Sequence, residues 1–236
     1  MKKDFKMRTG LIIGEEGLEK LNKSNVIVFG VGGVGSFAAE AIARAGVGNL
    51  TIVDFDDVDI TNINRQLPAL HSTVGKYKVE VMKERILDIN PDINIRSLKM
   101  LYNEETSEEI LNEEYDYVVD AIDMVTSKIH LIETCKQKGF RIISSMGMGN
   151  KLDPTKIEVT DIHKTSMCPL AKVMRKEMKD RKIKKLKVVY STEKPQPLTQ
   201  RIMNGRKITP GSTSFVPSVG GLIIASQVIN ELLGME

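Results

Sequence analysis

The feature that most constrains the fold of this chain is a glycine-rich segment between a short apolar run and an alanine-rich stretch. Residues 25–29 (NVIVF) are typical of a buried strand, and residues 33–45 have the composition of a helix. A glycine turn between them directs backbone N–H groups and the positive end of a helix dipole to one point. Asp54 ends the next apolar run, where its carboxylate can accept hydrogen bonds from ribose hydroxyls. The pattern predicts a nucleotide-binding site, with a turn formed by Gly30, Gly32, Gly33 and Gly35.

Strand-like and helix-like segments alternate along residues 1–150, which is typical of β-α-β units around a parallel sheet. We therefore expect an α/β fold, a doubly wound Rossmann-like sheet with helices on both faces and a small C-terminal extension. In such folds the ligand binds beyond the carboxyl ends of the strands. The expected strands are 25–29, 49–53, 93–98, 115–121 and 141–145, and the expected helices are 33–45, 76–89, 106–111 and 126–138.

The composition changes after residue 150. Residues 1–150 hold 18 Lys or Arg against 23 Asp or Glu, whereas residues 151–236 hold 16 against 8. We expect one domain over residues 1–236, with a nucleotide-binding core at 1–150 and a basic part at 151–236. The basic part should contain strands at 156–162 and 186–191, a basic helix between Pro169 and Lys185, a long loop at 191–217 and a closing helix at 218–233.

Several classes of protein are excluded or disfavoured. The two cysteines, Cys135 and Cys168, form no Cys-x-x-Cys pair, which excludes a disulfide framework and argues against a thiolate zinc site. No secretory signal follows the charged start, and the closing apolar helix is too short and too polar for a membrane span. We expect a cytoplasmic protein without a membrane span. A structural role is favoured for Cys168 over a thiolate role, and the histidines show no metal-ligand spacing.

The glycine turn alone does not identify the nucleotide, because a nicotinamide dehydrogenase has the same glycine spacing. Arg65 and Lys78 follow Asp54 and favour nucleotidyl transfer, in which fixed cations stabilise the charge of the α-phosphate and the departing pyrophosphate. Asp123 follows the strand predicted at 115–121 and is a candidate Mg²⁺ ligand. The alternatives are solvated charges for Arg65 and Lys78, and a helix N-cap for Asp123.

Taken together, these motifs resemble the superfamily of ubiquitin-activating-type (ThiF-like) adenylyltransferases, over most of residues 8–162. Residues 30–48, 57–66 and 152–161 are most similar to its bacterial tRNA threonylcarbamoyladenosine dehydratase family. The resemblance implies ATP and Mg²⁺ as cofactors and a homodimer in which Arg8 reaches the neighbouring subunit's site. It also implies catalytic roles for Arg65, Lys78 and Asp123, a metal ligand in Asp123, and contacts to the nucleotide from Gly30, Gly32, Gly33, Gly35, Asp54, Asn62, Arg65, Gln66, Lys78 and Asp123.

The reaction implied by the resemblance is the ATP-dependent cyclising dehydration of N6-threonylcarbamoyladenosine in tRNA through an acyl-adenylate. The attacking carboxylate is ionised at neutral pH, so no general base is required. Ring closure within one side chain needs no enzyme nucleophile. The alternative is adenylation of the C-terminal glycine of a ubiquitin-like sulfur carrier, and a sulfur-relay protein is a candidate partner. An oxidoreductase and a non-catalytic nucleotide sensor remain open.

A cluster of cations in the C-terminal part indicates the partner. Residues 164–187 contain ten Lys or Arg against two acidic residues, a density that fits a nucleic-acid backbone because neutralised phosphates release counterions. The alternative is a solvated charged face. The candidate tRNA-binding residues are Arg175, Lys179, Lys182, Lys184 and Lys185.

Overall fold

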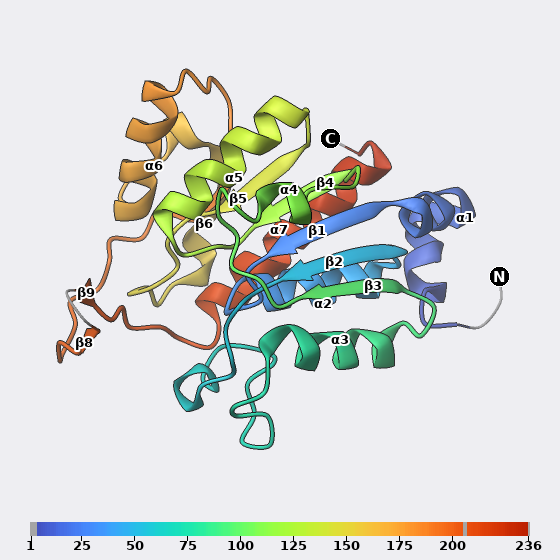
Figure 1. Ribbon diagram of the computed structural model, residues 1–236, viewed down its shortest axis with the longest axis horizontal. Helices are drawn as coiled ribbons and strands as arrows, with labels where there is room; N and C mark the ends of the chain where they lie inside the picture. Colours follow the sequence, from blue (N-terminus) through green and yellow to red (C-terminus); the bar gives the residue numbers. More distant parts are fainter. Residues whose placement is uncertain (1–3, 205–206, 236) are drawn as a thin grey trace.

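The computed structural model describes residues 4–204 and 207–235. Its main sheet has seven strands in the order β3-β2-β1-β4-β5-β7-β6, and a separate pair is formed by β8 and β9 (Figure 1). The strands are β1 (Asn25–Phe29), β2 (Asn49–Val53), β3 (Asn94–Leu98), β4 (Tyr117–Asp120), β5 (Ile142–Ser145), β6 (Ile157–Asp161), β7 (Lys187–Ser191), β8 (Met203–Asn204) and β9 (Lys207–Ile208). The helices are α1 (Met7–Lys23), α2 (Gly35–Ala45), α3 (Lys78–Ile89), α4 (Ser107–Ile110), α5 (Val125–Lys138), α6 (Pro169–Asp180) and α7 (Val216–Leu233).

The sheet is parallel except at one edge. In the main sheet, β3, β2, β1, β4, β5 and β7 pair in parallel, and β6 runs antiparallel to β7. Strand β1 pairs with β2 on one side and with β4 on the other. The strands after β1 are thus added first toward one edge of the sheet and then, from β4 on, toward the other edge. This is the switch point of a doubly wound sheet, and it predicts a crevice beyond the carboxyl ends of β1 and β4.

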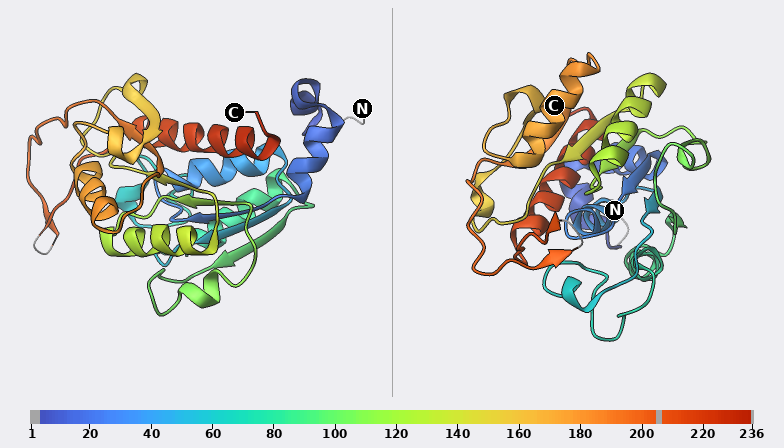
Figure 2. Two further views of the ribbon diagram at one scale, coloured as in Figure 1. Left: turned by 90° about the horizontal axis from the view of Figure 1, so that it is seen from above. Right: turned by 60° about the vertical axis from the view of Figure 1, so that its left-hand side comes forward.

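Two apolar cores lie on the two faces of the sheet. One core joins α1, α2, α3 and α7 to the sheet, and the other joins α4, α5 and α6. Figure 2 shows α2 and α7 side by side on one face and α5 on the other. The doubly wound α/β fold is therefore confirmed, and each expected element lies within a few residues of its predicted bounds except the basic helix.

The basic helix is shorter than its predicted range. It begins at Pro169, where Cys168 caps the helix, and it ends at Asp180 rather than near Lys185. Lys182 has a left-handed backbone (φ 58°), which a helix cannot continue through. Lys182, Lys184 and Lys185 are therefore in an exposed turn between α6 and β7.

Helix α7 is the one helix of the described residues that is long and apolar enough to cross a membrane, and 50% of it is buried inside the molecule. It packs against α2 and the sheet, as a core helix does. A Cβ atom at Gly221 would lie 2.3 Å from the backbone oxygen of Val34, so only glycine allows so close an approach. Helix α7 therefore braces the turn that precedes α2.

Candidate functional site

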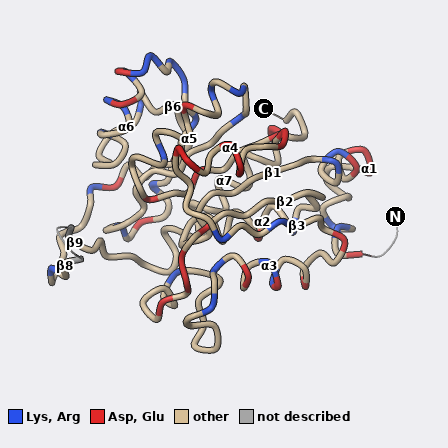
Figure 3. The backbone as a smooth tube through the Cα atoms, viewed as in Figure 1, with Lys and Arg blue, Asp and Glu red and all other residues tan. Residues whose placement is uncertain are grey.

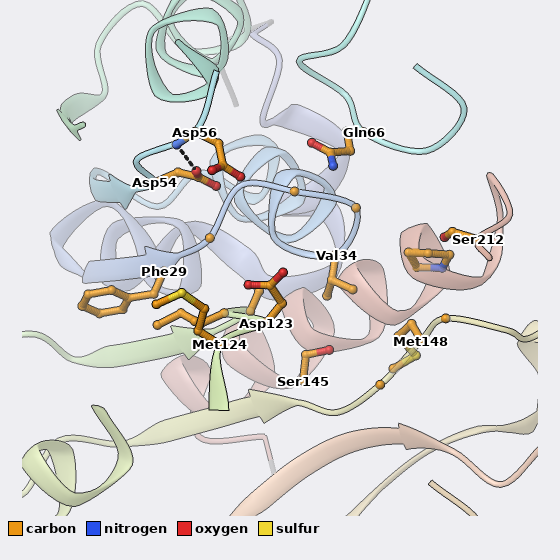
Figure 4. Close-up of a pocket in the computed structure, with 18 of the residues that line it drawn as sticks. Phe29, Val34, Asp54, Asp56, Gln66, Asp123, Met124, Ser145, Met148 and Ser212 are labelled. Carbon is orange, nitrogen blue, oxygen red and sulfur yellow. Dashed lines mark hydrogen bonds between the residues drawn. The ribbon is translucent and has the colours of Figure 1, made fainter. Parts of the chain in front are cut away.

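A pocket of about 340 Å³ opens beyond the carboxyl ends of β1, β2, β4 and β5. Figure 4 shows Asp54 and Asp56 on one side of the glycine turn, with Asp123 and Ser145 on the other side. Ser212 and Met148 lie at the far end. The lining residues come from the ends of successive strands, as the switch point of the sheet predicts.

The glycine turn forms one wall of this pocket. Gly30 has φ 82°. It lies so close to the residue that follows the neighbouring strand β4 that a Cβ atom would be 2.8 Å from the carbonyl oxygen of Ala121. Gly32 and Gly33 line the pocket directly. Gly35 is not part of the lining; its role is packing, because a Cβ atom there would lie 1.7 Å from the oxygen of Gly30. The turn thus exposes backbone to the pocket and seats α2 against β1.

Asp54 lies at the carboxyl end of β2 and is fixed by two backbone donors. Its Oδ2 accepts from the N–H of Val31 (2.8 Å). Its Oδ1 accepts from the N–H of Asp56 (2.9 Å), the bond drawn in Figure 4. Burial raises the pKa of the Asp54 carboxyl, and the nearby Lys78 cation acts in the opposite direction. The carboxylate is oriented beside the glycine turn and retains lone pairs for a bound hydroxyl.

Arg65 is a cation on the pocket wall without a carboxylate partner among the described residues. Its Nη1 donates to the carbonyl oxygen of Thr61 (3.0 Å) and to Oδ1 of Asn64 (2.8 Å), which fix the guanidinium, while the Cγ and Cδ atoms of the same side chain lie beside Gly33. Burial lowers the pKa of the Arg65 guanidinium, which stays protonated at neutral pH. A fixed, uncompensated cation at a helix N-terminus favours a bound anion.

Lys78 does not line the pocket. It is buried (5% exposed), and its Nζ donates to Oδ2 of Asp56 (2.7 Å). Asp56 lines the pocket and was not among the predicted site residues. Lys78 thus contacts the pocket indirectly, through the lining residue Asp56. Because the Asp56 carboxylate is 47% exposed and water competes for it, a phosphate can replace it as the partner of Lys78.

Asp123 lines the pocket and is exposed. The alternative role as a helix cap does not hold, because the N-cap of α5 is Met124 and no side chain caps that helix. No cluster of three or more His, Cys, Asp or Glu that could hold a metal occurs in the described residues. A single free carboxylate fits Mg²⁺, which commonly takes one or two protein carboxylates and completes its shell with phosphate and water.

The two amide residues of the motif differ. Asn62 is outside the pocket lining, and its Oδ1 accepts from the N–H of Asp59 (3.1 Å) in a capping box. Gln66 lines the pocket beside Gly32, and its Oε1 is buried without a hydrogen-bond partner in the part of the chain described. An unpaired buried acceptor is costly, so Gln66 fits a site that a donor from a ligand completes.

Arg8 does not reach the pocket of its own chain. It is exposed in α1, which lies at the end of the sheet opposite the carboxyl ends of the strands (Figure 1). The expectation that it enters a neighbouring subunit's site therefore remains a prediction.

A buried ion pair behind the pocket was missed by the sequence reasoning. Asp120 and Lys128 are both 0% exposed, and Nζ of Lys128 donates to Oδ2 of Asp120 (2.8 Å) and to the carbonyl oxygen of Ser145 (3.0 Å). Ser144 Oγ donates to the same carboxylate oxygen (2.5 Å), and the N–H of Ile122 donates to its Oδ1 (3.1 Å). The pair ties α5 to the carboxyl ends of β4 and β5. In the sequence, the only sign of this ion pair is one charged residue among the apolar residues of β4 and one on the buried face of α5.

The remaining walls are apolar or come from distant loops. Phe29 and Tyr102 meet edge to face with ring centroids 4.9 Å apart, and both line the pocket. The long loop, whose path the sequence left open, contributes Pro210, Gly211 and Ser212. Pro217, at the start of α7, also lines the pocket, 3.2 Å from where a Cβ atom of Gly33 would be. These residues carry no charge, so no motif drew attention to them.

The cations of the basic segment differ in their pairing. Nη1 of Arg175 donates to the carbonyl oxygen (2.9 Å) and to Oγ1 (2.6 Å) of Thr165, so this residue is engaged within the chain. Arg181 pairs with Glu133 and Glu177, and Lys187 pairs with Glu231. Within residues 4–204 and 207–235, no ion pair involves the exposed lysines Lys164, Lys172, Lys176, Lys179, Lys182, Lys184 and Lys185.

Neither cysteine is accessible. Cys135 is buried in α5, and burial raises the pKa of its thiol. Cys168 is 2% exposed, and its Sγ accepts from the N–H of Ala171 (3.5 Å) at the start of α6. Of the histidines, His71 is exposed and lies outside the pocket lining.

A family model described as "ThiF family" matches residues 6–236. The chain belongs to the ThiF family. It is 49% identical to the tRNA threonylcarbamoyladenosine dehydratase of Bacillus subtilis, and the match covers 96% of this chain and 93% of that protein. The structure matches that of the Escherichia coli tRNA N6-threonylcarbamoyladenosine dehydratase in complex with ATP with a TM-score of 0.89 and 34% identity, over 97% of this chain and 93% of that one.

A ThiF-family relative with the alternative chemistry matches less of the chain. The molybdopterin-synthase adenylyltransferase of Haemophilus influenzae is 37% identical, but the match covers 55% of this chain and 53% of that protein. The resemblance to the tRNA threonylcarbamoyladenosine dehydratases is therefore confirmed, including in the basic C-terminal part.

Proposed function

We propose that this protein is an enzyme that uses ATP to dehydrate and cyclise the N6-threonylcarbamoyl side chain of an adenosine in tRNA. The observation that carries the proposal is the similarity to a tRNA threonylcarbamoyladenosine dehydratase along nearly the whole of both chains. The arrangement of the pocket supports it, because a fixed cation and an open glycine turn meet there beyond the switch point of the sheet.

The chemistry is a transfer of AMP followed by ring closure. The threonyl carboxylate attacks the α-phosphorus of ATP, and pyrophosphate leaves. A group of the same side chain then attacks the activated acyl carbon, and AMP leaves with the oxygen that the side chain loses. The net change in the nucleoside is the loss of one water, and no nucleophile of the protein is required.

The residues of the pocket have separate roles in this scheme. Arg65 stabilises negative charge on the transferred phosphorus, and Lys78 supports it once phosphate replaces Asp56 as its partner. Asp54 accepts from the ribose, and the backbone of Gly32 and Gly33 cradles the phosphates. Asp123 would hold Mg²⁺, which neutralises phosphate charge when bound.

Three further features belong to the proposal. The enzyme acts as a cytoplasmic homodimer, in which Arg8 of α1 enters the pocket of the other subunit. The exposed lysines of residues 164–187 attract the tRNA backbone. A sulfur-relay protein is a candidate partner of the same enzyme.

The test uses tRNA from cells that lack this protein, so that the side chain is still open. Incubation with ATP and Mg²⁺ should release pyrophosphate and AMP, and mass spectrometry of the digested nucleosides should show the loss of one water. Pyrophosphate release that depends on a ubiquitin-like carrier and not on tRNA would replace the proposal with carrier adenylation.

A further inference from the structure

A two-stranded hairpin immediately precedes the pocket residues Pro210, Gly211 and Ser212. Strands β8 and β9 pair antiparallel with Met203 opposite Ile208, and the N–H of Thr209 donates to the carbonyl oxygen of Ile202 (2.8 Å). The hairpin projects from the end of the molecule toward which the main strands point (Figure 1, Figure 2).

The base of the hairpin is fixed to the pocket. The N–H of Gly211 donates to Oδ1 of Asn150 (2.7 Å), and the N–H of Asn150 donates to the carbonyl oxygen of Gly211 (2.8 Å). Asn64, next to Arg65, donates to the carbonyl oxygen of Ser212 (3.0 Å). Gly211 and Ser212 also line the pocket, so the base of the hairpin is part of the pocket wall.

The hairpin presents apolar side chains to solvent. Ile202 is 65% exposed, Met203 is 58% exposed and Ile208 is 44% exposed. Exposed apolar side chains that gather on one projecting element are a candidate contact surface for another molecule.

The amino-acid sequence of the hairpin region and the neighbouring α6 segment favour an anionic partner. The sequence from Arg201 to Ile208 holds three cationic residues and no acidic one. The exposed lysines of the α6 segment lie at the same end of the molecule (Figure 3). Aliphatic side chains flanked by cations match RNA, whose bases offer apolar faces inside an anionic backbone.

We propose that Ile202, Met203 and Ile208 contact the nucleobases next to the modified adenosine and take the place that this adenosine leaves in the base stack. The inference rests on the function proposed above. Enzymes that act on a nucleobase take it out of the stack, and Ile, Leu, Met or Phe side chains of nucleic-acid-binding proteins insert between unstacked bases.

The test compares the Ile202→Ser, Met203→Ser double variant with Leu70→Ser, which removes a 55% exposed apolar side chain outside the pocket lining. A stem-loop RNA carrying 2-aminopurine beside the reactive adenosine reports unstacking by its fluorescence. We expect the double variant to bind this RNA about tenfold more weakly, because it buries less apolar surface. It should lose the fluorescence increase and keep the wild-type affinity for ATP, whereas Leu70→Ser should behave as the wild type.

Wild-type RNA affinity and a wild-type fluorescence increase in the double variant would overturn the inference and assign the hairpin to another partner, such as a protein. Failure of the wild-type enzyme to dehydrate tRNA would instead overturn the proposed function. The two failures are therefore distinguishable.

Discussion

The cations of the pocket and those of the α6 segment differ in how they are held. Around the pocket, Lys128 and Lys78 are buried against carboxylates, and Arg65 is fixed by neutral oxygen acceptors. Along residues 164–187, seven exposed lysines have no ion pair in the described parts of the chain. Fixed, desolvated charge stabilises a charge that develops at one point, whereas mobile, hydrated charge attracts a polyanion from a distance. The difference predicts that mutations in the two regions act on different steps.

The largest effect is expected for Arg65→Ala. Loss of one fixed donor to a developing phosphate charge should reduce AMP formation about 10²- to 10³-fold. Quantitative analysis of AMP and pyrophosphate under single-turnover conditions measures it. The matched control is Arg44→Ala, which removes an exposed guanidinium paired with Glu40. Turnover within tenfold of the wild type would remove Arg65 from the mechanism.

The next effect concerns stability. Lys128→Met leaves the Asp120 carboxylate buried without its cation, which should lower the free energy of unfolding by about 3–5 kcal/mol. Adding Asp120→Asn removes the uncompensated charge and should restore part of the loss. Urea denaturation of the two single variants and the double variant gives the coupling. If the effects simply add, the pair does not act as a unit.

Charge reversal at Lys182, Lys184 and Lys185 tests the other region. The triple Glu variant should bind tRNA more weakly and show a slope of log affinity against log salt smaller by about 2–3, while its affinity for ATP is unchanged. Filter binding over a salt series measures the slope. The control reverses the exposed Lys20, Lys23 and Lys136 of α1 and α5. An unchanged slope in the triple variant would place the RNA elsewhere.

The smallest effect is expected on the stability of the Asp54→Asn variant, and this effect depends on pH. Because burial raises the pKa of Asp54, the folded state binds a proton more tightly than the unfolded state does. The wild type should therefore gain stability relative to Asp54→Asn as pH falls through the Asp54 pKa, and lose that gain as pH rises again. Thermal melts of both proteins from neutral to acidic pH measure the difference. A constant difference would contradict the raised pKa.

The parallel core was predictable because each of its elements carries a local signal. The apolar run before Gly30, the carboxylate after β2 and the sequence around Asp123 appear in the order in which a doubly wound sheet presents them. Helix α1 was not anticipated, since Gly10, Gly14 and Gly17 lower its helical propensity and buried contacts stabilise it instead.

Features that depend on contacts distant in sequence could not be read in advance. The antiparallel pairing of β6 with β7 and the contacts of the long loop with Asn64 and Asn150 have no local signature. The buried position of Lys78 and its pairing with Asp56 follow from tertiary packing. The sequence therefore indicated part of the pocket lining, whereas Gly35, Asn62 and Lys78 lie outside it and Arg8 is distant from it.

The contact of α7 with the glycine turn has a consequence for biosynthesis. Pro217 and Gly221, near the end of the chain, press against Gly33 and Val34, near its beginning. While the ribosome is still making the chain, the β1–α2 turn emerges long before the helix that supports it. The part of the pocket wall that Pro217 forms is therefore missing until α7 has been synthesised.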